Sequence, residues 1–504
     1  MQGKLRKAVA GLVVASIACA GGLAYMHANA AESNVGELGF ANELRIPPLA
    51  EGVLDADGTR VFELDLQEGS TEFRDGVETP TWGVNGSYLG PTLRVRRGER
   101  VRIEVRNGLP EATTLHWHGM HLPAAADGGP HQTIEPGAVW SPGWKVGQPA
   151  ATLWYHPHMM GSTAAHVYRG VAGMFIVDDD EADAAGLPGR YGVDDVPLIV
   201  QDRRFNGDGS FDESAGMISP TGILGDEILV NGTRDPHFDV TTRLVRLRLL
   251  NAANARIFNL GLADRRPLWL VGTDGGLLPE PVERETLQLS PGERAEVLVR
   301  MAPGERVVLR SFEPDLGADF FNEPFVGGKD EFDVLELRAA DELSGPSEPP
   351  SRLVEMPEPD PGEAVGAREF VLNGTTINAQ AMDMGRIDAV VERDASEVWV
   401  VRNDASIPHS FHVHDVRFHV LAVDGEGPPP ELSGLKDTVN VRPKTEMRLL
   451  VRFEDYADPG LPCMFHCHVL QHEDRGMMGQ FVVVDGSDER PGRIEAEHAD
   501  HAGR

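Results

Sequence analysis

The sequence predicts an all-β protein built from three related β-sandwich domains. A chain of 504 residues is long enough for about three domains of ~150 residues each. Its 56 glycines and 36 prolines suit many short strands joined by tight turns. A similar strand–turn–strand pattern recurs at residues 93–101, 287–295 and 441–449, which indicates a repeated unit.

The first predicted element is a secretory signal at residues 1–30. Cations near the start precede an apolar run at 8–25, and small residues follow as far as Ala30. This order is typical of a signal that is cleaved after Ala30. An uncleaved anchor is the alternative, because the run is near the lower limit of membrane-spanning length. In both cases we expect a periplasmic or secreted protein; the general and twin-arginine export routes both stay open.

After the leader, alternation of apolar and polar residues predicts half-buried strands at 93–105, 244–250, 295–299 and 398–401. A stretch rich in Pro and Glu separates the last two domains and is typical of a linker. The predicted division of the chain is a first sandwich at 45–180, a second at 190–340, a linker at 341–366, a third sandwich at 367–486 and a polar tail at 487–504.

The most informative segment surrounds Cys467, which is flanked by His466 and His468 and followed by His472 and Met477. Side chains of an extended strand alternate between its faces, so His466 and His468 face one side and Cys467 the other. A Cys, a His and a weakly bound Met are what a blue-copper site takes from one loop. The segment therefore predicts copper on one face of a strand and further metal on the other.

Residues 409–414 show the same two-sided arrangement. His412 and His414 share one face of a predicted strand, and His409 lies on the other, where it can join Cys467 and His472. Imidazole binds copper well, so four His-X-His pairs suit a three-copper cluster. The pairs are His116 and His118, His156 and His158, His412 and His414, and His466 and His468.

An accidental origin of this pattern has to be considered for each part. A single His-X-His pair is a weak signal, whereas the string around Cys467 is specific; the four pairs and that string, in this order, make an accident negligible. The tail histidines could alternatively bind a stray metal ion. The histidines expected to be satisfied or solvated are His27, His121, His131, His166, His237, His419, His498 and His501.

These motifs resemble those of three-domain bacterial multicopper oxidases, the group that contains spore-coat laccase and periplasmic copper-efflux oxidase. The resemblance covers roughly residues 40–486. Besides the histidine motifs, it includes Gly-Pro-Thr-Leu-Arg-Val-Arg-Arg-Gly-Glu (90–99), Asp-Gly-Gly-Pro (127–130) and Gln-Pro-Ala-Ala-Thr-Leu-Trp-Tyr-His-Pro-His (148–158). It implies three cupredoxin-like Greek-key sandwiches and four copper ions: one of type 1, one of type 2 and two of type 3.

The resemblance also implies a role for each ligand, and none is missing from the sequence. Type-1 copper would be bound by Cys467, His409 and His472, with Met477 as axial ligand. Type-2 copper would be bound by His116 and His412. The type-3 pair would be bound by His118, His156, His158, His414, His466 and His468.

The expected reaction follows from these roles. A substrate gives single electrons to type-1 copper, near the surface through His472, and they pass through Cys467 to a trinuclear cluster between the first and third domains. Four electrons then reduce dioxygen to two waters. The second domain holds no predicted ligand, so we expect it to set the spacing of the other two.

Two carboxylates are candidate proton relays, because imidazoles committed to metal cannot supply protons. Asp127 and Glu473 occupy positions where the family places such acids, and Asp127 could also orient water at the cluster. The alternatives are a turn residue before two glycines for Asp127 and a solvated acid for Glu473.

The methionine content bears on the class of substrate. Copper-efflux relatives carry a methionine-rich insertion and a cuprous site before the first type-1 histidine, but residues 403–408 contain no methionine. Met382 and Met384 are too few for a soft-metal pocket and are more often packing residues. We therefore favour a laccase-like enzyme for phenols and aromatic amines, with a Cu(I) or Mn(II) oxidase as the alternative.

Composition limits the other possibilities. A formal net charge of −33 argues against nucleic acid as a partner, and we expect a monomer. Cys19 lies in the leader and Cys463 has no free partner, so no structural disulfide is expected, and Cys463 is predicted to be a small buried hydrophobe. A copper nitrite reductase needs fewer His-X-His pairs, and a non-enzymatic scaffold of this fold would have lost ligands.

Overall fold

The computed structural model describes residues 31–215, 219–486, 488 and 490–494. The predicted leader lies outside the described residues, as do Cys19, His498 and His501. Within the described part, the strands form six sheets, and these pair into three sandwiches, so the protein is all-β as the sequence predicts. No helix of that part is long and apolar enough to cross a membrane.

The first sandwich contains the His116 and His156 motifs. One sheet has the order β10-β7-β4-β3, with β5 and β9 paired to β4 and β7, and the other has the order β2-β6-β12-β11-β8. Its strands are β2 (Leu49–Ala50), β3 (Val53–Leu54), β4 (Arg60–Arg74), β5 (Val77–Val84), β6 (Thr92–Arg96), β7 (Arg100–Asn107), β8 (His116–His118), β9 (Val139–Trp140), β10 (Gly143–Lys145), β11 (Ala151–His156) and β12 (Gly173–Asp178).

The second sandwich has sheet orders β1-β16-β24-β23-β18-β21 and β15-β14-β13-β17-β22-β19-β20. Its strands are β1 (Asn42–Glu43), β13 (Asp195–Arg203), β14 (Glu227–Val230), β15 (Thr233–Arg234), β16 (Pro236–Thr242), β17 (Leu244–Asn251), β18 (Phe258–Leu262), β19 (Leu268–Thr273), β20 (Gly276–Arg284), β21 (Thr286–Leu289), β22 (Arg294–Arg300), β23 (Arg306–Phe312) and β24 (Phe332–Ser344).

The third sandwich has sheet orders β26-β25-β28-β33-β30-β31 and β27-β35-β34-β29-β32. Its strands are β25 (Ala364–Asn373), β26 (Thr376–Ile377), β27 (Ala389–Glu392), β28 (Ala395–Asn403), β29 (His409–Val413), β30 (Phe418–Val423), β31 (Leu435–Lys436), β32 (Thr438–Val441), β33 (Glu446–Phe453), β34 (Cys463–Cys467) and β35 (Met478–Val484).

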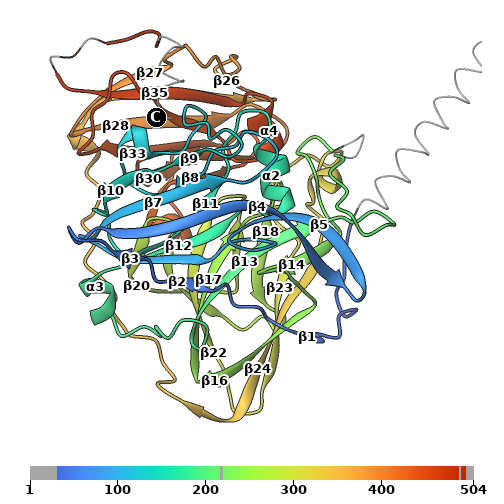
Figure 1. Cartoon of the computed structure of the whole chain (residues 1–504). Coiled ribbons are helices and arrows are strands. Elements are labelled where there is room, and N and C mark those ends of the chain that lie inside the picture. The colour runs from blue at the N-terminus through green and yellow to red at the C-terminus, as the bar shows by residue number, and fades with distance from the viewer. Residues whose placement is uncertain (1–30, 216–218, 487, 489, 495–504) are drawn as a thin grey trace, which may run out of the picture.

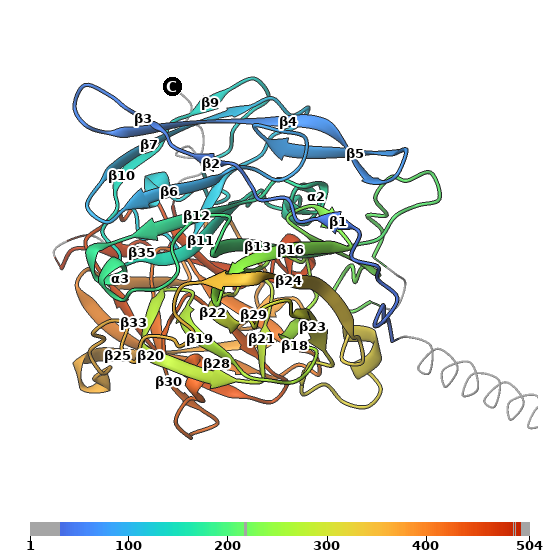
Figure 2. The ribbon, with the colours of Figure 1, turned by 90° about the horizontal axis from the view of Figure 1, so that it is seen from below.

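Each sandwich encloses its own apolar core, because alternate residues of the facing strands point inward. Phe175 lies in the first core, Phe258 in the second and Trp399 in the third, and all three are fully buried. In Figures 1 and 2 the sandwiches are coloured blue to teal, green to yellow and orange to red, and they pack against one another. The three sandwiches therefore pack against one another along three interfaces, or seams.

Short helices fill the connections. Among them, α2 and α4 lie together, and the Asp474 carboxylate accepts hydrogen bonds from the backbone N–H groups of Thr163 (2.9 Å) and Ala164 (3.0 Å) at the start of α2. The described helices are α2 (Thr163–Arg169), α3 (Asp180–Ala184), α4 (Leu470–Asp474) and the 3₁₀ turns η1 (Ala124–Ala126), η2 (Glu323–Val326), η3 (Pro361–Glu363) and η4 (Pro430–Leu432).

The predicted linker is shorter in the structure, since β24 continues to Ser344 and β25 begins at Ala364. Between them the chain runs along the second sandwich, where Leu353 is buried in the core and its N–H donates to the carbonyl of Pro279 (2.8 Å). The third sandwich is thereby connected by a segment that packs against the protein.

An ion pair crosses the seam between the first and third sandwiches. His121 Nδ1 lies 2.8 Å from Asp415 Oδ1, and His121 Nε2 lies 3.2 Å from Asp455 Oδ2. Burial alone would lower the pKa of His121, but Asp415 raises it to about 9. Burial also raises the pKa of Asp415, yet its Oδ1 accepts from both His121 and Leu122 N–H, as a carboxylate does. The pair therefore consists of a His121 imidazolium and an Asp415 carboxylate.

Replacing His121 by Gln should make stability less dependent on pH. Because the folded pKa of His121 lies above its ordinary 6.5, the pair stabilises the fold fully below pH 6.5, and its contribution is lost as pH rises through about 9. The contribution is at most about 3 kcal/mol. Melting temperatures of wild type and variant should differ most at pH 6 and converge near pH 10. The matched control, His419→Gln, lacks this ion pair; an equal trend there would contradict the assignment.

Candidate metal centres

Two pairs of strands bring the His-X-His motifs together. In the first sandwich β8 lies antiparallel to β11, with His116 opposite His156. In the third, β29 lies antiparallel to β34, with His412 opposite His466. The two pairs meet across the seam, where His116 stacks on His414 with ring centroids 3.8 Å apart and His118 stacks on His412 at 3.7 Å. All eight imidazoles of the four motifs are at most 1% exposed.

One set of three rings converges on a single point. The Nε2 atoms of His158, His414 and His466 are separated by 3.1, 3.1 and 3.2 Å. His414 Nδ1 donates a hydrogen bond to Asp127 Oδ2 at 2.9 Å, so its Nε2 carries a lone pair that points at the other two. These three nitrogens could hold one metal ion.

A second set lies beside the first. His156 Nε2 is 3.4 Å from both His118 Nδ1 and His468 Nε2. The opposite nitrogen of His118 donates to Asp437 Oδ1 (3.1 Å), and that of His156 donates to the Pro157 carbonyl (2.8 Å). The inward nitrogens of both rings are therefore lone-pair acceptors.

His116 and His412 form a third set, one ring from each sandwich. Their Nδ1 atoms donate to the backbone carbonyls of Asp127 and Asp437, each at 2.9 Å. Their Nε2 atoms are buried and have no hydrogen-bond partner among the residues that the structure describes. This leaves two more lone pairs that face the same buried space.

These donors fit metal ions. Burial lowers the pKa of His158 to about 3 and moves the pKa of His118, His156 and His414 well below the ordinary value, so the rings are neutral. Neutral imidazole lone pairs that converge at 3.1–3.4 Å repel one another unless a cation lies between them. Buried polar groups without partners would otherwise be costly.

A separate donor set lies on the other face of β34. Cys467 Sγ is 3.4 Å from His409 Nδ1 and 3.6 Å from His472 Nδ1, and all three residues are buried. Burial raises the pKa of the Cys467 thiol to about 12, so the thiolate that a metal needs forms only on metal binding. Met477 is also buried, and its carbonyl accepts a hydrogen bond from Cys467 N–H (3.0 Å). One thiol, two imidazoles and a nearby thioether suit copper.

Comparison with known proteins identifies the family. Sequence profiles described as "Multicopper oxidase" match residues 65–182 and 356–487. "Multicopper oxidase mco" of Staphylococcus haemolyticus is 34% identical over 88% of this chain and 93% of its own length. The chain belongs to the multicopper oxidase family. It is an oxidoreductase with oxygen as acceptor, and the family implies copper as its cofactor.

Two further relatives extend the comparison. "Cell division protein FtsP" of Xenorhabdus nematophila is 38% identical over 88% of this chain and 92% of the relative. The solved structure of a bacterial laccase-like multi-copper oxidase, CueO from Ochrobactrum sp., is 38% identical, has a TM-score of 0.80 and matches 88% of this chain and 100% of that chain. These matches span all three sandwiches.

The position of His472 differs from the expectation. A location near the surface is expected from the sequence, but in this oxidase His472 is 1% exposed, and its Nε2 lies 2.9 Å from the carbonyl of Pro220 in the second sandwich. Contacts with another sandwich cannot be read from the Cys467 motif. Beside α4 there is instead a cavity of about 250 Å³, lined by Ala164, Ala165, Tyr168, Glu213, Ile223, Gln471, Asp474 and Arg475.

The two predicted relay acids both lie at the imidazole sets and are 1% exposed. The oxygens of Glu473 are 3.5 Å from His158 Nδ1 and 3.2 Å from His466 Nδ1, and burial raises the pKa of its carboxyl. Asp127 uses Oδ2 for His414, and its Oδ1 is 3.3 Å from His116 Nδ1. Glu473 is therefore not a solvated acid, and Asp127 contacts two rings besides preceding two glycines in a turn.

Sequence reasoning missed Asp437. Its carbonyl accepts from His412 Nδ1 and its Oδ1 from His118 Nε2, so it contacts rings of two different sets. Burial would raise the pKa of Asp437, but Arg294 holds it well below the ordinary value. The segment Lys-Asp-Thr at 436–438 carries no metal-binding spacing, so only the folded arrangement reveals this role.

Proposed function

We propose that the protein binds four copper ions and is a laccase-like oxidase. Cys467, His409 and His472, with Met477 as axial ligand, are assigned to type-1 copper, and His116 and His412 to type-2 copper. The type-3 pair is assigned to His118, His156 and His468 on one side and to His158, His414 and His466 on the other. The observation that carries this proposal is the placement of Cys467 and His466 in contact with different donor sets from adjacent positions of β34.

Bound copper would supply one-electron redox chemistry at each site, so that one ion at the Cys467 set and three at the imidazole sets together would store four electrons. The role of the chain is to connect the two. Cys467 is joined through one peptide bond to His466 and through another to His468, so electrons need no diffusing carrier. Four substrate molecules each lose one electron, and dioxygen takes up the four electrons and four protons to give two waters.

We propose that a small organic substrate binds in the cavity beside α4, whose lining includes Gln471, the residue before His472. Tyr168, Ile223 and the two alanines give this cavity an apolar wall suited to an aromatic ring. The relative from Ochrobactrum is described as having oxidase activity towards lignin model compounds and lignosulfonate. We therefore propose phenols and aromatic amines as substrates.

Oxidation of Cu(I) or Mn(II) is the second candidate. Glu213 and Asp474 place two carboxylates in the same cavity, and carboxylate oxygens suit Mn(II). A structural role in cell division, the name carried by the Xenorhabdus relative, is less well supported. Ten buried imidazoles and a thiol arranged in metal-holding sets favour an enzyme.

We further propose that Asp127 and Glu473 deliver protons to the cluster. Each acid is buried, and each lies within 3.5 Å of imidazoles that are assigned to the trinuclear cluster. Glu473 is one residue away from Asp474, which lines the cavity beside α4 and has its pKa raised by burial to about 7. Export to the periplasm or outside the cell is proposed from the leader sequence alone.

Cys467→Ser tests the type-1 assignment. A hydroxyl is a poor copper ligand, so the variant should lose the intense thiolate-to-copper band near ~600 nm that is expected of such sites. Copper content should fall from about four to about three per chain, and oxidation of a phenol should stop. Cys463→Ser is the matched control, since Cys463 is buried in the same strand but outside the donor set. Retained colour and turnover in Cys467→Ser would overturn the proposal.

Asp127→Asn tests the relay. The amide oxygen can still accept the hydrogen bond from His414, so copper binding and the blue band should persist. Loss of a group that carries protons should slow dioxygen consumption by about 10²-fold or more. Oxygen-electrode rates with a phenol measure this, and unchanged turnover would remove Asp127 from the relay.

Steady-state kinetics with a phenol, Cu(I) and Mn(II) side by side distinguish the two substrate classes. We expect the highest kcat/KM with the phenol. Replacing Glu213 by Gln should then leave the phenol rate nearly unchanged, because the apolar wall of the cavity is intact. A dominant Mn(II) or Cu(I) rate that falls in Glu213→Gln would instead establish the metallo-oxidase.

A further inference from the structure

The second sandwich contributes no ring to the imidazole sets but touches them directly. Its turn at residues 290–293, between β21 and β22, places Gly292 against two of the rings. A Cβ atom on Gly292 would lie 2.9 Å from His468 Cδ2 and 3.1 Å from His118 Cε1, and the φ of Gly292 is +88°. Only glycine fits there. The turn thus closes one side of the sets assigned to the cluster.

Arg294, the first residue of β22 after this turn, contacts all three sandwiches. Its Nε donates to Thr152 O on β11 of the first sandwich (2.9 Å). One terminal nitrogen donates to Asp437 Oδ1 (2.7 Å) and Gly292 O (3.1 Å), and the other to Asp437 Oδ2 (2.6 Å) and Asp274 O (3.0 Å). A guanidinium has five N–H donors, so every one is used. Arg294 is fully buried.

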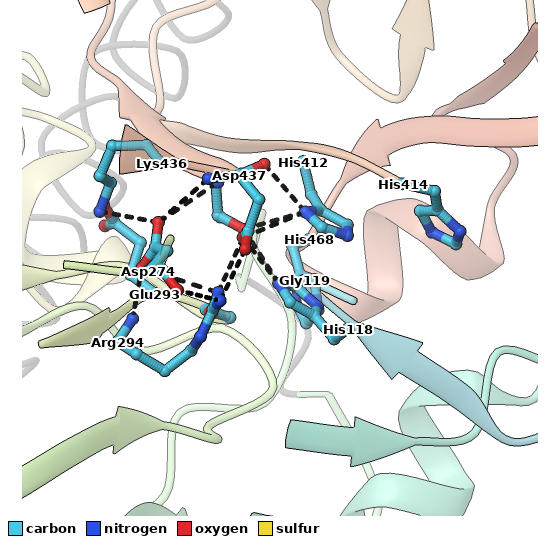
Figure 3. A network of polar contacts seen from close by, with 12 residues as sticks. His118, Gly119, Asp274, Glu293, Arg294, His412, His414, Lys436, Asp437 and His468 are labelled. Carbon is cyan, nitrogen blue, oxygen red and sulfur yellow. Dashed lines mark hydrogen bonds and ion pairs between the residues drawn. The ribbon is translucent and has the colours of Figure 1, made fainter. Parts of the chain in front are cut away.

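Asp437 passes this constraint to the rings (Figure 3). While Arg294 holds both carboxylate oxygens, Oδ1 also accepts from His118 Nε2 (3.1 Å) and from the Thr438 hydroxyl (2.8 Å). The main-chain carbonyl of Asp437 accepts from His412 Nδ1 (2.9 Å). Asp437 therefore fixes which nitrogen of His118 and of His412 carries hydrogen and where the free nitrogen points.

Ion pairs between Lys436, next to Asp437, and the second sandwich hold residues 436–438 in place. Lys436 Nζ lies 2.9 Å from Asp274 Oδ2 and 2.8 Å from Glu293 Oε1, and both acids belong to the second sandwich. All five charged side chains of this network are at most 4% exposed. Figure 3 shows the two cations lying among the three carboxylates. A buried ionic network of this kind tolerates loss of a partner poorly.

We propose that Arg294 is a positioning residue for the trinuclear cluster, acting through Asp437 on His118 and His412. This gives the second domain a direct part in oxygen reduction, beyond setting the spacing of its neighbours. The inference rests on the proposed copper sites. Arginine suits the role because its planar fork grips both oxygens of one carboxylate, whereas a lysine ammonium is a point charge.

Arg294→Lys tests this, since it keeps the charge but cannot make the two parallel hydrogen bonds. The matched control is Arg248→Lys. Arg248 is equally buried in the second sandwich, grips both oxygens of Asp195 (2.6 and 3.1 Å) and reaches Thr152 of the first sandwich, yet contacts none of the assigned ligands. Both variants are purified with copper and compared with wild type by copper content, visible absorption, electron paramagnetic resonance and melting temperature.

In Arg294→Lys we expect the type-1 band and its resonance signal to match wild type. The type-2 resonance signal should shift or weaken, and azide affinity at the cluster should change. Type-2 copper affinity and the rate of reoxidation of reduced enzyme by dioxygen should each fall by roughly 10- to 100-fold, the usual effect of losing such an outer partner. Arg248→Lys should leave all of these unchanged.

A double-mutant cycle checks the route of the effect. If Arg294 acts through Asp437, then Asp437→Asn should produce the same type-2 change. The double variant Arg294→Lys/Asp437→Asn should be no worse than the stronger single variant, whereas independent effects would add. Additive losses would overturn the proposed route through Asp437.

Two other results would overturn the inference. One is a wild-type type-2 signal and reoxidation rate in Arg294→Lys. The other is joint loss of type-1 and cluster signals, which would show a general collapse instead of a local change. Failure of the proposed function looks different, because wild type itself would then lack the type-2 signal or the expected copper content.

Discussion

Alternation of side chains along β34 is the constraint on which the metal-site architecture depends. Cys467 faces one donor set while His466 and His468 face the others, although all three are consecutive in the chain. The pairing of β34 with β29, which places His412 opposite His466, fixes the register. A shift by one residue would move every donor to the wrong face. Two chemically different sites are thus held a peptide bond apart without any loop between them.

The first and third sandwiches hold the buried rings by a reciprocal arrangement of two aspartates. Asp127 accepts from His116 through its carbonyl and from His414 of the other sandwich through its carboxylate. Asp437 does the same with His412 and, across the seam, with His118. Each acid therefore orients one ring of its own sandwich and one of the partner sandwich. Burial keeps the rings neutral, and these acceptors aim the free nitrogens inward.

The second sandwich contacts both donor sets although it supplies none of their imidazoles. Gly292 packs on two imidazoles, and the turn around it is bound to the third sandwich by a hydrogen bond between the Ser290 and Ser410 hydroxyls (2.8 Å). Pro220, from the same sandwich, covers His472 on the opposite face of β34. A part of the chain that contains none of the assigned ligands therefore contacts His118 and His468 at one donor set and His472 at the other.

The all-β class follows from the sequence and is confirmed, and the motifs also predict the donor side chains that the structure brings together. Strand periodicity and the spacing within a His-X-His or His-Cys-His motif are local properties. The contacts of Asp437 with Arg294 and His118, and the burial of His472, are visible only in the folded protein. The bond from His118 to Asp437 spans 319 positions, and that from Arg294 to Asp437 spans 143. No local pattern encodes such contacts, because they depend on how three separately formed sandwiches pack at their seams.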